Sequence, residues 1–125
     1  MFRSIADQLF GSRVSYTDVR HAIVNYIVKE KDTFSLFMED DEPFADYVER
    51  MRNDKEWGGH QELYAAAQVY AVNIYVHQVD GPRFVVAGDE AKRSIHLSYH
   101  GEYHYNSVRA ADDNDDGSAR EISLE

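Results

Sequence analysis

The chain has 125 residues, of which 43% are hydrophobic, and it carries a formal net charge of −10 at pH 7 without a single cysteine. This length corresponds to one domain, no apolar run approaches the roughly 18 residues of a membrane-spanning helix, and the acidic balance disfavours nucleic acid as a partner. The lack of cysteine excludes disulfides, thiolate metal sites and a cysteine nucleophile within these residues.

Five helices are predicted in the first part of the chain. Apolar residues at helical spacing, a capping-box pattern at Ser15 and the proline at Pro43 mark where they begin. The expected helices run from the start of the chain to near Gly11, over about 16–27, around 34–38, over about 43–51 and over about 61–70. The first residues lack the apolar run of a secretory signal, so we expect a cytoplasmic protein. Because an apolar residue stands at position 2 with no loop before it, we also expect further sequence upstream of Met1.

From Val72 onwards the apolar period changes to two, which predicts strands. These are expected around 72–77, 84–86, 95–99 and, after a turn at Gly101, 103–109. Helices followed by strands predict an α+β fold, with the N-terminal helices packed on a small, mainly antiparallel sheet. Residues 111–125 hold six acids and one base, and we expect this tail to be disordered.

The last predicted strand carries the strongest candidate for catalysis. Side chains alternate faces along a strand, so His104, Asn106 and Val108 share one face. Same-face neighbours lie roughly 6–7 Å apart, so the Asn106 amide could orient the His104 ring and leave one ring nitrogen free as a base. A histidine held in this way is part of a cysteine- or serine-protease triad. The plain alternative is a strand histidine beside an ordinary asparagine, because His-x-Asn alone is a weak motif.

Two other kinds of site are considered. His96 and His100 share one strand face and could form a zinc site with His104, although no acid or cysteine on that face completes the ligand set. The alternative places His96 and His100 toward solvent. A serine nucleophile is the other possibility, but no serine stands in a Gly-x-Ser-x-Gly elbow, and Ser4 alone lies near a helix start.

Two loop segments have open interpretations. The first, Trp57-Gly58-Gly59, is either a ligand-facing loop or, as we prefer, a turn whose tryptophan covers the core. The acidic run at 39–42 is interpreted as a solvated helix cap.

Several segments, in order and spacing, resemble the ovarian-tumour (OTU) domain family of cysteine deubiquitinases. They are residues 2–9 (FRSIADQL), Val19-Arg20, residues 44–48 (FADYV) with Met51 and residues 57–63 (WGGHQEL), residues 72–77 (VNIYVH), and residues 95–99 (IHLSY) with residues 102–109 (EYHYNSVR). The resemblance implies a papain-like α+β fold for a domain over 1–110, a separate tail over 111–125, and hydrolysis of ubiquitin isopeptide bonds. The implied partner is ubiquitin or polyubiquitin, and no cofactor or metal is implied.

The same resemblance assigns roles to individual residues. In the family, the nucleophile lies in Asp-Gly-Asn-Cys, followed by an apolar residue and Phe-Arg, and Met1 stands at that apolar position. The cysteine would therefore immediately precede Met1, so we expect a domain that lacks its N-terminal catalytic loop and is inactive as given. His104 corresponds to the general base and Asn106 to its orienting partner. The alternative is a pseudoenzyme that binds ubiquitin without cleaving it.

Overall fold

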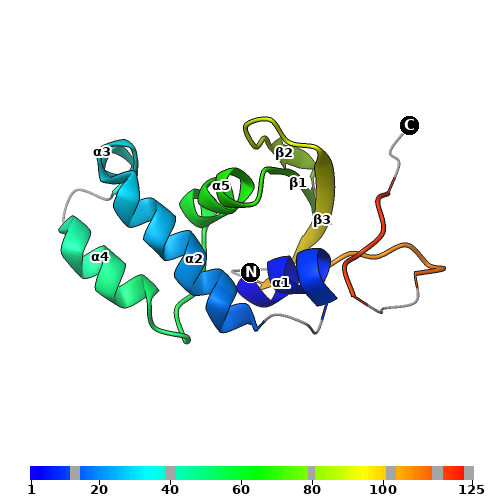
Figure 1. The fold of residues 1–125 in the computed structure, drawn as a ribbon, viewed down its shortest axis with the longest axis horizontal. Helices are drawn as coiled ribbons and strands as arrows, with labels where there is room; N and C mark the ends of the chain where they lie inside the picture. The colour runs from blue at the N-terminus through cyan, green and yellow to red at the C-terminus, as the bar shows by residue number, and fades with distance from the viewer. Residues whose placement is uncertain (12–14, 39–41, 79–80, 101–103, 114–116, 123–125) are drawn as a thin grey trace.

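The computed structural model describes residues 1–11, 15–38, 42–78, 81–100, 104–113 and 117–122. Within these ranges, five α-helices and one short 3₁₀ helix precede a four-stranded sheet (Figure 1). The helices are α1 (Phe2–Phe10), α2 (Tyr16–Lys29), α3 (Lys31–Phe34), η2 (Ser35–Phe37), α4 (Phe44–Met51) and α5 (His60–Val69). The strands are β1 (Val72–Gln78), β2 (Phe84–Val86), β3 (Arg93–His100) and β4 (His104–Ser107). The α+β architecture predicted from the sequence is confirmed.

Local sequence explains where the helices begin and end. The Ser15 hydroxyl caps α2 by accepting a hydrogen bond from the Thr17 backbone at 3.0 Å. Pro43 is the N-cap of α4, one residue earlier than its expected place inside the helix. Gly11 ends α1 with a φ of 62°, a left-handed conformation that favours glycine.

The helices and the sheet enclose one core. In Figure 1, α3 and α4 lie at one end of the molecule, α5 lies between α2 and the curved sheet, and the chain after β4 extends beyond the sheet at the other end. α1 packs beside β3 and β4. Fully buried side chains come from both parts and include Ile5, Ile23, Ile27, Leu63, Ile74, Ile95 and Leu97. None of the helices in the described ranges has the length and hydropathy that crossing a membrane requires.

The strand order is β2-β1-β3-β4, and the sheet is mixed. The outer pairs β1–β2 and β3–β4 are antiparallel, as expected, whereas the central pair β1–β3 is parallel. The parallel pair arises because β2 occupies one side of β1, so the chain crosses back and places β3 on the other side in the same direction. The turn predicted at Gly101 lies outside the described residues.

The described part of the C-terminal tail lies against the body, which differs from the disorder expected for residues 111–125. Ala119 is buried, its backbone N–H donates to the Gln8 carbonyl at 2.8 Å, and its own carbonyl accepts from Arg93. Arg109 also fixes the start of this segment, since it pairs with both Asp7 and Asp113. Acidic composition predicted a solvated tail, but the small Ala119 and the paired charges stabilise a docked one.

Candidate functional site

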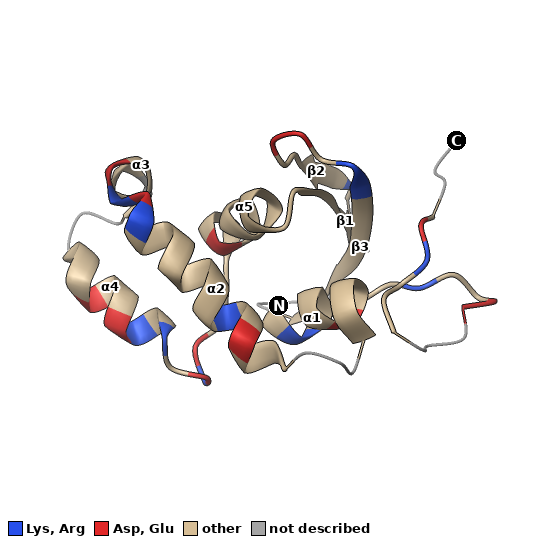
Figure 2. Cartoon of the chain, viewed as in Figure 1, with Lys and Arg blue, Asp and Glu red and all other residues tan. Residues whose placement is uncertain are grey.

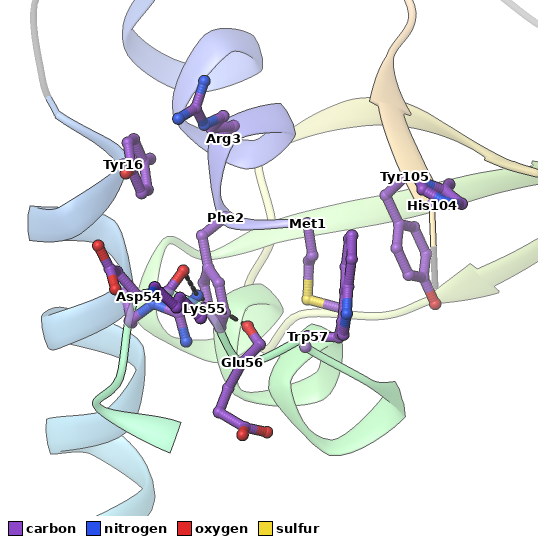
Figure 3. Close-up of a pocket in the computed structure, with 12 residues that line it drawn as sticks. Met1, Phe2, Arg3, Tyr16, Asp54, Lys55, Glu56, Trp57, His104 and Tyr105 are labelled. Carbon is purple, nitrogen blue, oxygen red and sulfur yellow. Dashed lines mark hydrogen bonds between the residues drawn. The ribbon is translucent and has the colours of Figure 1, made fainter. Parts of the chain in front are cut away.

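A pocket of about 480 Å³ lies where the start of α1, the loop between α4 and α5, and the start of β4 meet (Figure 3). Met1, Phe2 and Arg3 line it from α1, Tyr16 and Arg20 from α2, residues 54–58 from the loop, and His104 and Tyr105 from β4. The pocket therefore brings together segments that are about a hundred residues apart in the sequence.

His104 stands at the wall of this pocket as the first residue of β4. Its side chain is exposed, and its backbone pairs with His100 across the β3–β4 ladder. The Trp57 ring packs against it, with ring centroids 5.2 Å apart and an interplanar angle of 69°. Because His104 is exposed and lines the pocket, its imidazole remains accessible to a reactant there.

Asn106 follows the alternation expected along β4. His104 and Asn106 are exposed, whereas Tyr105 and Ser107 between and after them are partly buried. Asn106 lies opposite Ser98 on β3. Among the hydrogen bonds of the described residues, none joins the Asn106 amide to the His104 ring, so the orienting role of Asn106 stays a prediction.

Three polar side chains of α1 hold β4 in place through contacts that no local sequence pattern predicted. The Ser4 hydroxyl donates to the Tyr105 carbonyl at 2.8 Å. The Gln8 amide donates to the Ser107 hydroxyl at 2.8 Å and to the Val108 carbonyl at 2.7 Å. The Ser107 hydroxyl in turn donates to Asp7 at 2.6 Å. Ser4, Asp7 and Gln8 follow i, i+3, i+4 spacing, which places them on one side of α1.

The loop that carries Trp57 is fixed from two sides. Arg20, which is 4% exposed, donates to the backbone carbonyls of Met51 and Glu56, each at 2.8 Å, and to that of Asp54 at 3.3 Å. On the other side, the buried Glu62 carboxylate accepts a hydrogen bond from the Gly59 backbone at 2.6 Å and another from the Tyr47 hydroxyl.

Burial of Glu62 raises the pKa of its carboxyl above the ordinary value, even though the hydrogen bonds from Tyr47 and Gly59 act in the opposite direction. Trp57 itself is 54% exposed and contacts His104. Our preferred interpretation of Trp57 as a cover for the core is therefore wrong, and the loop faces the pocket instead.

The zinc alternative loses its support in the structure. His96 is 1% exposed, not solvent-facing, and its Nδ1 lies 3.0 Å from the Nε2 of His77. The His96 ring also stacks on Tyr75. Burial, with the nearby charge of His77, lowers the pKa of His96. Among the residues that the structure describes, no group of three or more His, Cys, Asp or Glu could hold a metal ion.

The structure also gives no support to a serine nucleophile among these residues. Ser4 is buried, and its hydroxyl is engaged by the Tyr105 carbonyl. The Ser98 hydroxyl lies 2.9 Å from His100, and that of Ser107 donates to Asp7. These serines support the architecture of the site, and none of their hydrogen bonds reaches His104.

Comparison with known proteins gives a consistent result. The family model described as OTU-like cysteine protease matches residues 1–109. The chain is 45% identical to the ovarian tumor domain-containing deubiquitinating enzyme 7 of Arabidopsis thaliana, covering 99% of this chain and 34% of that protein. It is 30% identical to OTU domain-containing protein 3 of Mus musculus, covering 95% of this chain and 31% of that protein. The chain thus spans about a third of the length of these curated relatives.

Solved structures show the same fold. The OTUD1 OTU domain superposes with a TM-score of 0.74 at 24% identity, covering 85% of this chain and 75% of that one. An OTU domain in complex with ubiquitin superposes with a TM-score of 0.69 at 25% identity, covering 86% of this chain and 62% of that one.

Proposed function

The chain belongs to the OTU-like cysteine protease family, and we propose that it forms the histidine side of a deubiquitinase active site. In this proposal, His104 is the general base and Asn106 is its orienting partner. The nucleophile is a cysteine joined directly to Met1, as the family pattern places it. The proposed reaction is the thiol-dependent hydrolysis of isopeptide bonds to ubiquitin.

One observation carries this proposal: Met1 and His104 line the same pocket. A residue joined to the Met1 nitrogen would stand at the N-terminus of α1, beside the wall that His104 forms. The partial positive charge of a helix N-terminus lowers the pKa of a thiol placed there. Backbone N–H groups at a helix start can also stabilise the oxyanion of a tetrahedral intermediate.

The proposed steps use His104 twice. Its imidazole accepts the proton of the thiol, and the thiolate attacks the isopeptide carbonyl. His104 then donates that proton to the leaving lysine amine, which leaves a thioester between the cysteine and the ubiquitin carboxyl group. Water, deprotonated by His104, hydrolyses the thioester and restores the thiol.

The names of the relatives support ubiquitin or polyubiquitin as the partner. One relative is named a deubiquitinating enzyme, and one solved OTU domain is in complex with ubiquitin. Nucleic acid and membrane are not proposed as partners, because the net charge is −10 and basic residues are scattered among acids in Figure 2. The proposed compartment is the cytoplasm, whose reducing conditions keep a catalytic thiol free.

A second candidate function is ubiquitin binding without cleavage. It is favoured by the absence of cysteine from the 125 residues. In that case His104 and Asn106 have no catalytic task, and the pocket belongs to a binding module.

A cleavage assay separates the two candidates. The proteins are this chain, the same chain with Asp-Gly-Asn-Cys added before Met1, and a matched control with Asp-Gly-Asn-Ser. We expect cleavage of di-ubiquitin by the cysteine form alone, and loss of that cleavage on His104→Ala. A folded cysteine form that cannot cleave, or one that His104→Ala leaves unchanged, would overturn the proposal. Binding of ubiquitin by this chain with no cleavage by any form would support the second candidate.

A further inference from the structure

Arg20 is a buried cation that donates hydrogen bonds to backbone carbonyls at the end of α4 and in the loop that follows it. Its two terminal nitrogens reach the carbonyls of Met51, Asp54 and Glu56. Met51 is the last residue of α4, so Arg20 also satisfies a carbonyl at a helix C-terminus. The planar guanidinium suits this arrangement because it presents several donors in a fixed fork, which a lysine cannot reproduce.

The same guanidinium fixes the loop relative to α1. The Arg20 Cζ lies 4.2 Å from the centroid of the Phe2 ring, which is itself buried. Gly58 passes so close to the start of α1 that a Cβ there would lie 2.8 Å from the Met1 sulfur and 3.3 Å from the Phe2 ring. Arg20 and Gly58 therefore set the position of the loop against the helix start where the nucleophile is proposed.

Trp57 directly follows Glu56, whose carbonyl Arg20 binds, and directly precedes Gly58, which packs against the start of α1. Half of its surface is exposed, so burial in the core does not account for where its ring lies. The ring instead packs edge-to-face against His104, and Figure 3 shows it between Met1 and the start of β4. A contact of this kind limits the orientations that an exposed imidazole can adopt.

We propose that Arg20 is a positioning residue for His104, acting through the loop carbonyls and the Trp57 ring. Arg20 holds the loop, the loop holds Trp57, and Trp57 keeps the imidazole over the pocket. Arg20 touches neither substrate nor the reacting atoms in this scheme. The kinetic consequence of this inference rests on the proposed function, but its structural consequence at His104 does not.

The structural consequence is tested in this chain without any added cysteine. The NMR signals of the His104 ring protons report the nearby Trp57 ring current. We expect Trp57→Ala to shift these signals and Arg20→Lys to shift them in the same direction. Trp57→Phe keeps an aromatic ring at this position and should preserve most of the orientation of the His104 ring. Matched controls are Arg52→Lys, at an exposed arginine just after α4, and Tyr64→Ala, which removes another partly exposed aromatic ring.

The kinetic consequence is tested in the form with Asp-Gly-Asn-Cys before Met1. Misplacement of a catalytic group by about 1 Å can lower a rate roughly 100-fold, so we expect Arg20→Lys and Trp57→Ala to lower kcat by roughly 10- to 100-fold. KM should change little, because neither residue is proposed to bind ubiquitin. Trp57→Phe should restore most of the kcat lost in Trp57→Ala.

The outcomes separate this inference from the proposed function. Unshifted His104 signals in Trp57→Ala would overturn the inference, whatever the cleavage assay gives. If circular dichroism shows that the Arg20→Lys variant is unfolded, the Trp57→Ala variant, whose substitution is at an exposed site, still tests whether Trp57 positions His104. In that case, loss of kcat in Trp57→Ala supports the inference and unchanged kcat overturns it. An inactive cysteine form with shifted His104 signals contradicts the proposed function and leaves the positioning role supported.

Discussion

The hydroxyl of Ser4 donates a hydrogen bond to the backbone carbonyl of Tyr105 at 2.8 Å, although the two residues are 101 positions apart. This bond ties the first turn of α1 to the residue that follows His104. One turn later, Gln8 repeats the connection to Ser107 and Val108. The helix start and the histidine strand are therefore held in a fixed relation, which an active site divided between them requires.

Gln8→Leu should lower the free energy of unfolding by about 2–4 kcal/mol. Gln8 is 1% exposed and joins α1 to both β3 and β4, because its side-chain oxygen also accepts from the His96 backbone at 2.9 Å. Removing it leaves several polar groups without their partner in a largely buried place. Urea unfolding at pH 7 measures the change. Gln78→Leu, at an exposed glutamine that donates one hydrogen bond to the Pro82 carbonyl, is the control and should change stability by less than about 1 kcal/mol.

Gly58→Ala should destabilise the chain by up to about 1 kcal/mol, because the added methyl would push the flexible Met1 side chain aside and press on the Phe2 ring. Gly59→Ala is a matched control one residue later, where a Cβ would meet Glu62 Oε1 at an ordinary 3.5 Å. Thermal melts of the two variants give the comparison. Equal melting temperatures would contradict the close packing described between the loop and α1.

Asp7 should make stability sensitive to acid. Partial burial raises its pKa, but the hydrogen bonds from Arg109 and Ser107 outweigh this and hold the pKa below the ordinary 3.8. The stabilisation is therefore present above about pH 3.8 and is lost as the pH falls through the lower, folded-state pKa. Because the pair is partly exposed, we expect an effect of at most about 1 kcal/mol. Asp7→Asn should reduce this acid-dependent loss in urea titrations at pH 2–5, and an unchanged profile would contradict the assignment.

His96 should also couple stability to pH, in a higher range. Burial and the charge of His77 lower its pKa from 6.5, while Glu121 acts against them. A lowered folded-state pKa means that the stabilisation is present above about pH 6.5 and is lost as the pH falls below it. Replacing the ring by His96→Phe should flatten the decline in stability below pH 6.5. His21→Gln, at an exposed histidine of α2, should leave the decline unchanged.

Local pattern was enough to predict most elements of the fold. The spacing of apolar residues predicted all five helices to within a few residues, and the capping role of Ser15 follows from its own hydroxyl. The alternation along β4 likewise predicted that His104 and Asn106 share one face, which is the exposed face in the structure. These features depend on neighbours in the sequence, which a single sequence contains.

The features that were missed depend on partners far away in the sequence. The parallel pairing of β1 with β3 depends on which side of β1 the short β2 occupies. His96 is buried because Tyr75 and His77 on β1 stack against it, although its position along β3 allowed a solvent-facing side chain. Gln8 and Arg20 donate hydrogen bonds to backbone atoms that are far away in the sequence, and such bonds produce no periodic pattern of residues.

The reactivity of the added thiol tests the central claim most directly. With Asp-Gly-Asn-Cys before Met1, the chain has one cysteine, so alkylation by iodoacetamide reports that thiol alone. If His104 and the helix start activate it, the rate should have a midpoint pH well below about 8.5, and His104→Ala should move that midpoint upward. His21→Ala is the control and should not move it. A midpoint near 8.5 that is the same with and without His104 would contradict the claim that this pocket brings the two groups together.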